Sequence, residues 1–195
     1  RRTVTIGGKA QVVTEIVDLN RARAQAKGLS LTVVVEVPAS LRLLGDAVRL
    51  KQVLGNLVTN AIKFTPAGTI VVRAEGQPEG ARFRLRLSVS DTGPGIGAAD
   101  QGRLFLPFSQ LSADTEGTGL GLAISRQLVE AMNGRLLLSS EVGKGSTFTL
   151  EVTLSQTDLN PQHTPASSSW RFSGRALVVD DNTINVGVAA GLLTR

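Results

Sequence analysis

The stretch Asp91–Ile124, DTGPGIGAADQGRLFLPFSQLSADTEGTGLGLAI, combines an acidic residue with two glycine clusters that enclose a short polar loop. Because glycine lacks a Cβ, it permits positive φ and lets a ligand approach the backbone closely. The second cluster leads into apolar residues at a four-residue spacing, which predicts one face of a helix: Leu120, Ile124, Leu128 and Met132. The unpaired N–H groups at a helix start suit phosphate. The pattern therefore indicates a site for a phosphate-bearing ligand, with two ordinary glycine-rich turns as the alternative.

Asp91 opens this stretch, and at neutral pH its carboxylate only accepts hydrogen bonds. It therefore suits an exocyclic amine such as that of adenine, and not a phosphate. We infer a purine nucleotide with its base at the first cluster and its phosphates at the second. The motif GxxxxGK[ST] is absent and neither cluster spells GxGxxG, which argues against a P-loop or Rossmann site.

The composition is that of a globular protein with a real core, since 42% of the 195 residues are hydrophobic and 19% are charged. The absence of Cys excludes disulfides and thiolate metal sites. No apolar run approaches the ~18–20 residues of a membrane span, and no signal peptide opens the chain. The net charge of +5 raises the question of nucleic acid. However, the arginines of 82–86 alternate with apolar residues as on a solvated sheet face, so no nucleic-acid partner is expected.

Periodicity and turn residues predict the elements of the chain. The expected strands are 1–6, 29–37, 69–75, 82–90, 135–141 and 146–154, with a turn at 76–80 between the third and fourth. The expected helices are 9–27, 47–64 with Asp46 as its N-cap, and 119–133. Phe105 and Phe108 flank Pro107, and they form either the hydrophobic anchor of a mobile lid or part of the core.

The helix 47–64 carries Asn56, Asn60 and Lys63 within about 60° of one another at ~100° per residue, beside a wide apolar stripe. Amide oxygens can ligate Mg²⁺, and a lysine can hold phosphate as a point charge. The alternative is a solvated helix edge. Next to two glycine clusters, this row favours the magnesium and phosphate interpretation.

The composition changes after residue 154. Residues 155–174 are polar and rich in Ser and Pro, which predicts a linker in which His163 is solvated. From Arg175 the chain reads as a buried strand that ends at Asp180 and Asp181, followed by an amphipathic helix. Adjacent acids at the end of such a strand can bind a divalent cation.

Four motifs, in this order, resemble the nucleotide-binding boxes of sensor histidine kinases. The N box is matched by Asp46, Arg49, Leu50, Gln52, Val53, Leu54, Asn56, Leu57, Asn60, Ala61, Ile62, Lys63, Phe64 and Thr65. The first glycine box is matched by Asp91, Gly93, Gly95 and Ile96, and the F box by Phe105, Pro107 and Phe108. The second glycine box is matched by Gly117, Gly119, Leu120, Gly121 and Leu122.

The resemblance implies a two-layer α/β sandwich of the Bergerat type over residues 1–154, a mixed sheet with helices on one face. Residues 175–195 resemble the start of a doubly wound response-regulator receiver domain. Together they are similar to a hybrid sensor histidine kinase.

By the same resemblance, the domain positions Mg-ATP for γ-phosphoryl transfer to a histidine on a separate dimerisation domain, in two-component signalling. Asp91 is expected to bind the adenine amine, Asn60 with Asn56 to hold Mg²⁺, and Lys63 to hold phosphate. Thr147 resembles a residue that binds adenine through water. The remaining residues expected at the nucleotide are Gly93, Gly95, Ile96, Phe108, Thr118, Gly119, Leu120, Gly121 and Leu122. Asp180 and Asp181 are expected to hold a receiver Mg²⁺.

The implied activity is that of a protein-histidine kinase, with no catalytic residue in this chain because the acceptor-histidine domain is expected to precede Arg1. The implied partners are that helical domain, the receiver, a second copy in a homodimer, and a downstream phosphotransfer or response-regulator protein. The implied location is cytoplasmic, in a parent anchored in the inner or plasma membrane. The loop 110–117 is shorter than is usual in the kinases it resembles and lacks the basic residues often found there. If the lid is truly this short, ATP and ADP are expected to bind comparably.

Two other functions fit part of the pattern. One is a nucleotide-sensing pseudokinase module without catalysis. The other is an ATP-driven clamp like gyrase or the chaperones, which needs a carboxylate on the helix that bears Asn60. That helix has no acid beyond its N-cap, Asp46, so the sequence disfavours the clamp.

Overall fold

The computed structural model describes residues 2–4, 11–109 and 118–157, and the structural statements below concern this part of the chain. The predicted linker after Thr157, the receiver fragment with Asp180 and Asp181, and the loop 110–117 lie outside it. None of the helices in the described part is both long enough and apolar enough to span a membrane.

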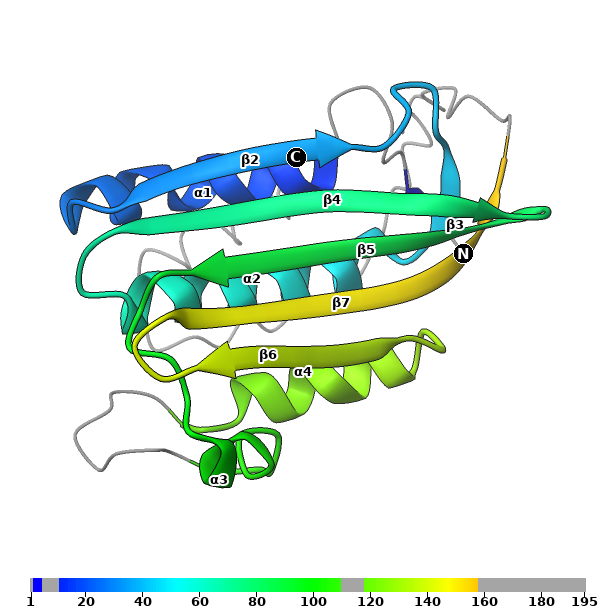
Figure 1. The fold of residues 1–195 in the computed structure, drawn as a ribbon. Coiled ribbons are helices and arrows are strands. Elements are labelled where there is room, and N and C mark those ends of the chain that lie inside the picture. The colour runs from blue at the N-terminus through cyan, green and yellow to red at the C-terminus, as the bar shows by residue number, and fades with distance from the viewer. Residues whose placement is uncertain (1, 5–10, 110–117, 158–195) are drawn as a thin grey trace, which may run out of the picture. The chain divides into compact units, whose positions relative to one another are not determined.

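Seven strands form one mixed sheet (Figure 1). They are β1 Arg2–Val4, β2 Ser30–Glu36, β3 Leu43–Gly45, β4 Thr69–Glu79, β5 Arg82–Asp91, β6 Arg135–Glu141 and β7 Gly145–Gln156. The order is β1-β3-β7-β5-β4-β2, and β6 also pairs with β7. The pair β2–β4 is parallel and the other pairs are antiparallel.

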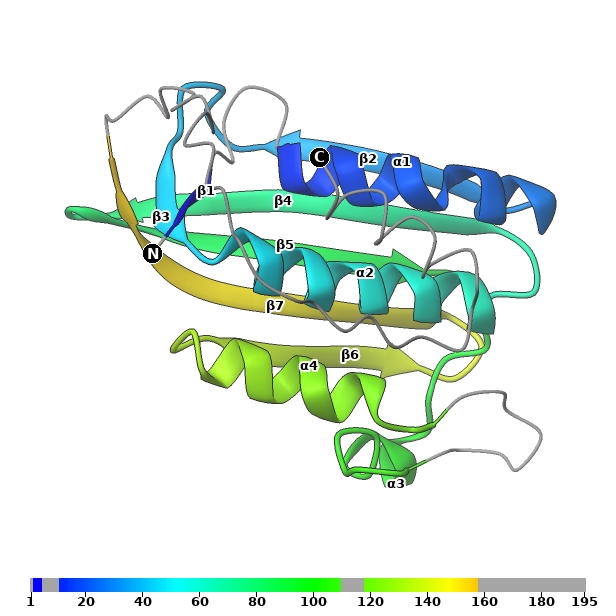
Figure 2. The same cartoon turned by 180° about the vertical axis from the view of Figure 1, so that it is seen from behind.

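The helices are α1 Gln11–Ala26, α2 Ala47–Phe64, the short α3 Ala98–Gln101 and α4 Gly121–Glu130. Figures 1 and 2 show α1, α2 and α4 side by side on one face of the sheet. This confirms the predicted two-layer sandwich with a mixed sheet. The core lies between the layers and is largely aliphatic, with fully buried side chains that include Leu50, Leu54, Leu57, Ile70, Leu85, Leu87 and Leu150.

Helix α2 spans the range that its sequence predicts. Asp46 caps it as expected, because its Oδ1 accepts from the N–H groups of Val48 and Arg49, both at 3.1 Å. At the other end the chain turns out of the helix at Thr65, whose N–H still donates to Ala61 O at 3.0 Å. The local sequence thus determines both ends of the element that carries Asn56, Asn60 and Lys63.

The predicted turn at 76–80 is wrong. Strand β4 continues to Glu79, and the turn lies at Gly80, where φ is +60°. Gly76 instead pairs with Leu85 inside the hairpin, and a Cβ at Gly76 would collide with the carbonyl oxygen of Arg84. The glycine therefore serves the close approach of two strands. The alternation in β5 is confirmed, since Phe83, Leu85 and Leu87 are buried and the arginines between them are not.

Helix α4 is shorter than the predicted 119–133 and buries a different face. Its buried residues are Ala123, Ser125 and Val129, whereas Ile124 of the predicted apolar series is 41% exposed. Leu128 and Met132 are partly buried against the core. The prediction placed Ile124 on the apolar face, but the inward position belongs to Ser125, whose hydroxyl has a partner on α2. Strand β3 and helix α3 are too short to give a periodic signal, and the sequence did not predict them.

Candidate nucleotide site

Helix α2 touches both glycine clusters. A Cβ at Gly93 would lie 3.1 Å from the carbonyl oxygen of Phe64, at the end of α2. A Cβ at Gly121 would lie 2.5 Å from Oδ1 of Asn56, two turns earlier. The two contacts are separated by roughly 12 Å along the helix axis at 1.5 Å per residue. Asn60 lies one turn from each, so the structure brings Asp91, Asn60 and the second glycine cluster to the same edge of the fold.

Asp91 ends β5 with its carboxyl group half-buried. Its Oδ1 accepts a hydrogen bond from the N–H of Gly93 at 2.8 Å. Burial raises the pKa of Asp91, and this effect exceeds the opposing one of the backbone N–H groups of Gly93 and Ser146. A carboxylate has about four acceptor positions. The group therefore retains capacity for donors from a ligand.

Gly95 and Ile96 attach the first glycine cluster to the β6–β7 hairpin. Gly95 has φ of +70°, and a Cβ there would collide with the carbonyl oxygen of Glu141. The N–H of Ile96 donates to Ser140 Oγ at 2.8 Å. Both contacts orient the loop that follows Asp91, so these two predicted site residues have a structural role whether or not they touch a ligand.

The second cluster opens α4 without a side-chain cap. The N-cap position is Leu120, and the first turn begins at Gly121. The Nδ2 group of Asn56 donates to Ser125 Oγ at 2.9 Å across the α2–α4 contact. The uncapped N–H groups of the first turn suit an anion. Asn56 thereby joins the two helices through its Nδ2 group, a contact that the sequence did not predict, while its Oδ1, the atom that could ligate Mg²⁺, lies toward Gly121.

The flanks of the second cluster differ in exposure. Thr118 is exposed and Leu120 half-buried, while Leu122 packs partly buried against the core. Gly119 has φ of +68°, and a Cβ there would lie 2.8 Å from the carbonyl carbon of Phe108. The residues on either side of the loop 110–117 thus meet at this glycine.

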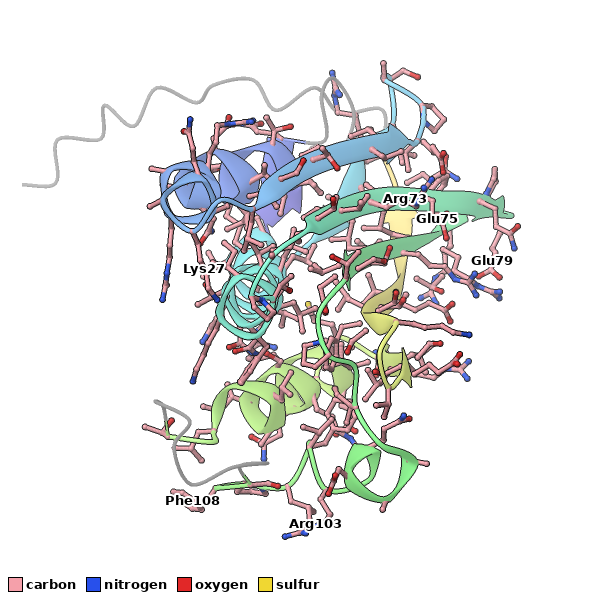
Figure 3. All side chains as sticks on the ribbon, turned by 60° about the vertical axis from the view of Figure 1, so that its left-hand side comes forward. Lys27, Arg73, Glu75, Glu79, Arg103 and Phe108 are labelled. Atoms are coloured by element: carbon pink, nitrogen blue, oxygen red, sulfur yellow. The ribbon has the colours of Figure 1, made fainter. Side chains whose placement is uncertain are left out.

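The two phenylalanines of the F box have different environments. Phe105 packs edge-on against Phe148, with ring centroids 6.5 Å apart and an interplanar angle of 77°. Phe108 is 75% exposed, and its φ of +61° is unusual for a side chain of this size. Figure 3 shows Phe108 directed away from the sheet. Of the two alternatives, lid anchor or core, Phe105 fits the core, whereas the ring of Phe108 is exposed.

Lys63 lies in the last turn of α2, half-buried, with its Nζ 5.0 Å from the centroid of the Phe64 ring. Lys27, from the end of α1, donates to the carbonyl oxygens of Ile62 and Lys63, both at 2.7 Å (Figure 3). A cation at a helix C-terminus satisfies its open carbonyl groups and its dipole. Lys27 therefore holds the end of α2 that contacts Gly93.

Thr147 is not brought together with Asp91. It pairs with Ser90, and its Oγ1 donates to Ser90 Oγ at 2.9 Å. Side chains alternate along a strand, so Thr147 and Ser90 face away from the helices while Asp91 and Ser146 face toward them. Ser146 is 7% exposed, with its Oγ 2.9 Å from Ser140 Oγ. Ser146 is a candidate that was not predicted from the sequence, although its alternation with buried Phe148 and Leu150 indicates its inward position.

No group of three or more His, Cys, Asp or Glu that could hold a metal ion occurs in the described ranges. A divalent cation at this edge would therefore need amide oxygens, of which Asn60 offers one, together with ligand oxygens. Such a donor set fits Mg²⁺ bound with a phosphate, because this ion is usually held by few protein groups.

A hollow of about 300 Å³ lies on the open face of the sheet, away from both glycine clusters. Its lining is Glu36, Glu75, Gly76, Gln77, Arg84 and Arg86. Figure 3 shows Arg73, Glu75 and Glu79 on the side of the sheet away from the helices. Ion pairs join Arg73 to Glu36 at 2.6 Å and Arg86 to Glu151 at 2.8 Å. The face is a network of paired surface charges, which agrees with its prediction as a solvated sheet face.

Comparison with known proteins identifies close similarities. Residues 45–156 match the family described as histidine kinase-, DNA gyrase B-, and HSP90-like ATPase. The virulence sensor protein BvgS of Bordetella bronchiseptica is 42% identical over 175 residues, which cover 84% of this chain and 14% of that protein. The sensor histidine kinase AruS of Pseudomonas aeruginosa is 43% identical over 180 residues, which cover 90% of this chain and 18% of that protein. The chain thus spans only a small part of the length of these curated relatives.

Solved structures share the fold. Full-length ShkA in complex with AMPPNP superposes with a TM-score of 0.65 and 36% identity, over 75% of this chain and 30% of that one. The nucleotide-free catalytic domain of histidine kinase ThkA gives a TM-score of 0.63 and 26% identity, over 78% of this chain and 98% of that one. The second comparison covers almost the whole of a catalytic domain, so the mixed sheet with its helices is the fold of that domain.

Proposed function

This chain belongs to the family of histidine kinase-, DNA gyrase B-, and HSP90-like ATPases, and we propose that it presents Mg-ATP for phosphoryl transfer to a histidine of another domain. It carries the ATP-binding catalytic domain of a sensor histidine kinase, by its family match and its similarity to proteins so named. The magnesium ion, the individual contacts and the transfer itself are the proposal.

The observation that supports the proposal is the position of α2 between the two glycine clusters. The half-buried carboxylate of Asp91 is at one end and the uncapped N-terminus of α4 at the other. We assign the base amine to Asp91, and the phosphates to the first-turn N–H groups of α4 with Lys63. Asn60, midway along the helix edge, is assigned to Mg²⁺. We assign Ser146 to the base site in place of Thr147, because its N–H acts on the Asp91 carboxylate.

A bound Mg²⁺ would supply charge neutralisation at the phosphates. The protein's own part is positioning, since catalysis of phosphoryl transfer consists mainly of orientation and electrostatic stabilisation. Asp91 anchors the base, and the N–H dipoles of α4 hold the phosphates in one direction. The terminal phosphoryl group is then available to a histidine on a helical dimerisation domain.

The proposed partners follow from the hybrid kinases that this chain resembles. They are the helical domain with its acceptor histidine, a receiver domain, a second copy of the parent protein, and a downstream phosphotransfer or response-regulator protein. A non-catalytic nucleotide sensor uses the same site and differs only in transfer. The clamp mechanism is disfavoured, because α2 contains no acidic residue in its eighteen positions.

Calorimetric titration of the chain with Mg-ADP and Mg-GDP tests the binding site. We expect ADP to bind in preference to GDP, and Asp91→Asn to weaken ADP binding at least tenfold, the effect of losing a hydrogen bond to a charged group. Asp18→Asn, the same change at an exposed residue of α1, is the matched control and should bind as the unmodified chain does. Equal binding of the two nucleotides, or no effect of Asp91→Asn, would refute the assignment.

Transfer is tested by adding labelled ATP to the chain with and without the parent's separate helical domain. Label is expected on the helical domain alone, and only when both parts are present. Binding without any transfer would favour the nucleotide sensor.

A further inference from the structure

Thr65 is the residue at which α2 ends, and its side chain has an unusual environment. The backbone leaves the helix there, with φ of −94° and ψ of +110°. The residue is fully buried, with an exposed fraction of 0%. Its hydroxyl oxygen has no hydrogen-bond partner in the part of the chain that the structure describes.

A buried hydroxyl without a partner is unfavourable, because it has lost its hydrogen bonds to water and gained none in return. Nearly all buried polar groups in folded proteins are paired. Valine has almost the same shape as threonine and would avoid this penalty. The hydroxyl of Thr65 is therefore expected to find its partner in another state of the protein, and the nucleotide-bound state is the one that its surroundings indicate.

Those surroundings are the first glycine cluster. The hydroxyl oxygen lies 3.4 Å from the position that a Cβ would occupy at Gly93, and Oδ1 of Asp91 lies 2.8 Å from the same position. The carbonyl oxygen of Phe64 is 3.1 Å from it. Three oxygen atoms are thus the nearest neighbours of this side of Gly93. Among the three, only the hydroxyl of Thr65 carries a hydrogen that it can donate at neutral pH.

We propose that Thr65 is a positioning residue of the base site: with nucleotide bound, its hydroxyl donates to the Asp91 carboxylate and orients that group toward the amine of the base. This inference rests on the function proposed above. Gly93 N–H already holds Oδ1 of Asp91, and Ser146 N–H acts on the same carboxylate. The hydroxyl of Thr65, at the end of α2, would be a third donor. It fixes the rotation of the Asp91 carboxylate about the Cβ–Cγ bond. The resulting increase in affinity is confined to nucleotides whose base donates a hydrogen bond to Asp91.

The test compares two nucleotides that differ at one position of the base. ADP carries the amine at position 6 of its purine, whereas IDP carries a carbonyl oxygen at that position, which cannot donate to Asp91. Thr65→Val removes the hydroxyl and keeps the shape, and Thr65→Ser keeps the hydroxyl. Thr65→Ala is a second hydroxyl-free variant, for the case that the valine variant fails to fold. Binding of Mg-ADP and Mg-IDP is measured by calorimetry, and nucleotide-free unfolding by urea.

Thr65→Val is expected to weaken ADP binding about tenfold, the size of one hydrogen bond to a charged group, and to leave IDP binding unchanged. Thr65→Ser should stay within about twofold of the unmodified chain for both, since it retains that bond. In an Asp91→Asn background the valine change should have no further effect on ADP. Without nucleotide, Thr65→Val should unfold at the same urea concentration or a higher one.

Parallel loss of ADP and IDP binding would overturn the role, because it would mean general damage to the pocket. Unchanged ADP binding in both hydroxyl-free variants would overturn it as well. If the unmodified chain bound neither nucleotide, the proposed function would fail first and this role with it. That outcome is distinct from normal ADP binding that is insensitive to Thr65.

Discussion

Asp91 is the residue to which the proposed base site assigns the amine of the base, and the burial of its carboxyl group has a consequence for stability. Burial raises the pKa of Asp91 in the folded chain. The folded state therefore binds a proton more readily than the unfolded state does. The resulting contribution to stability is fully present below the unfolded pKa and is lost as pH rises through the folded pKa. At neutral pH the buried charge is destabilising.

We therefore predict that Asp91→Asn does not lower the stability of the nucleotide-free chain at neutral pH. An asparagine keeps an oxygen that can accept from Gly93 N–H and removes the buried charge. Urea unfolding of both forms from acidic to neutral pH measures this, and the variant's advantage should shrink toward acidic pH. A variant that is less stable at neutral pH and equally stable in acid would contradict the sign of this pKa shift.

At the scale of elements, the contact between α2 and α4 has one tight point. A Cβ at Gly121 would lie 2.5 Å from Oδ1 of Asn56, well inside ordinary contact distance. We predict that Gly121→Ala destabilises the chain by about 1–2 kcal/mol through overpacking. In an Asn56→Ala background, which removes the amide, the same change should be neutral or stabilising by up to about 1 kcal/mol, because alanine favours helix.

A double-mutant cycle by urea unfolding measures this coupling. The Asn56→Ala change alone should destabilise by about 1 kcal/mol, because it removes the hydrogen bond to Ser125. Equal effects of Gly121→Ala in the two backgrounds would show that the helices adjust without using this contact.

The end of α2 supports a second prediction at the element scale. Lys27→Met removes two hydrogen bonds to the carbonyl oxygens of Ile62 and Lys63, and a cation from the C-terminus of the helix. We expect a loss of about 1 kcal/mol in the free energy of unfolding. Lys144→Met is the matched control. Lys144 pairs with Glu141 on an exposed turn, so its loss should change stability by less than about 0.5 kcal/mol.

At the scale of the whole molecule, the buried core that the structure describes lies within the first 154 residues. All seven strands end by Gln156, and the core side chains fall between Val12 and Leu154. We predict that a chain ending at Thr157 keeps its secondary structure, its cooperative unfolding and its affinity for Mg-ADP. Circular dichroism and calorimetry on the two lengths measure this. A large loss of unfolding cooperativity in the shorter chain would show that residues 158–195 complete the core.

Much of this molecule follows from local sequence. The bounds of α2 and its cap at Asp46 are confirmed, because a cap and an apolar stripe depend on neighbouring residues. The alternation of buried and exposed residues in β5 is also confirmed, because it too depends on neighbouring residues. The turn predicted at Gly76 fails because a glycine is used both in turns and where strands approach closely, and one sequence pattern does not separate these uses.

The candidate site can likewise be divided into features that the local sequence predicts and features that it does not. Its residue types could be predicted from the sequence, because a carboxylate, an Asn–Asn–Lys row and two glycine clusters each indicate a kind of ligand contact. The structure places Thr147 and Ser146 on opposite faces of the sheet, and strand alternation contains the information to predict this.

By itself, the sequence determined the family resemblance, the two-layer sandwich and the helix that carries the polar row, because these depend on motifs and on periodicity over short spans. Only the tertiary structure decided that Asn56 joins Ser125, 69 positions away, that Lys27 holds the end of α2, and that Thr65 faces Gly93 without a partner. Such contacts depend on how helices cross and which strands pair, and no local pattern of side chains specifies either.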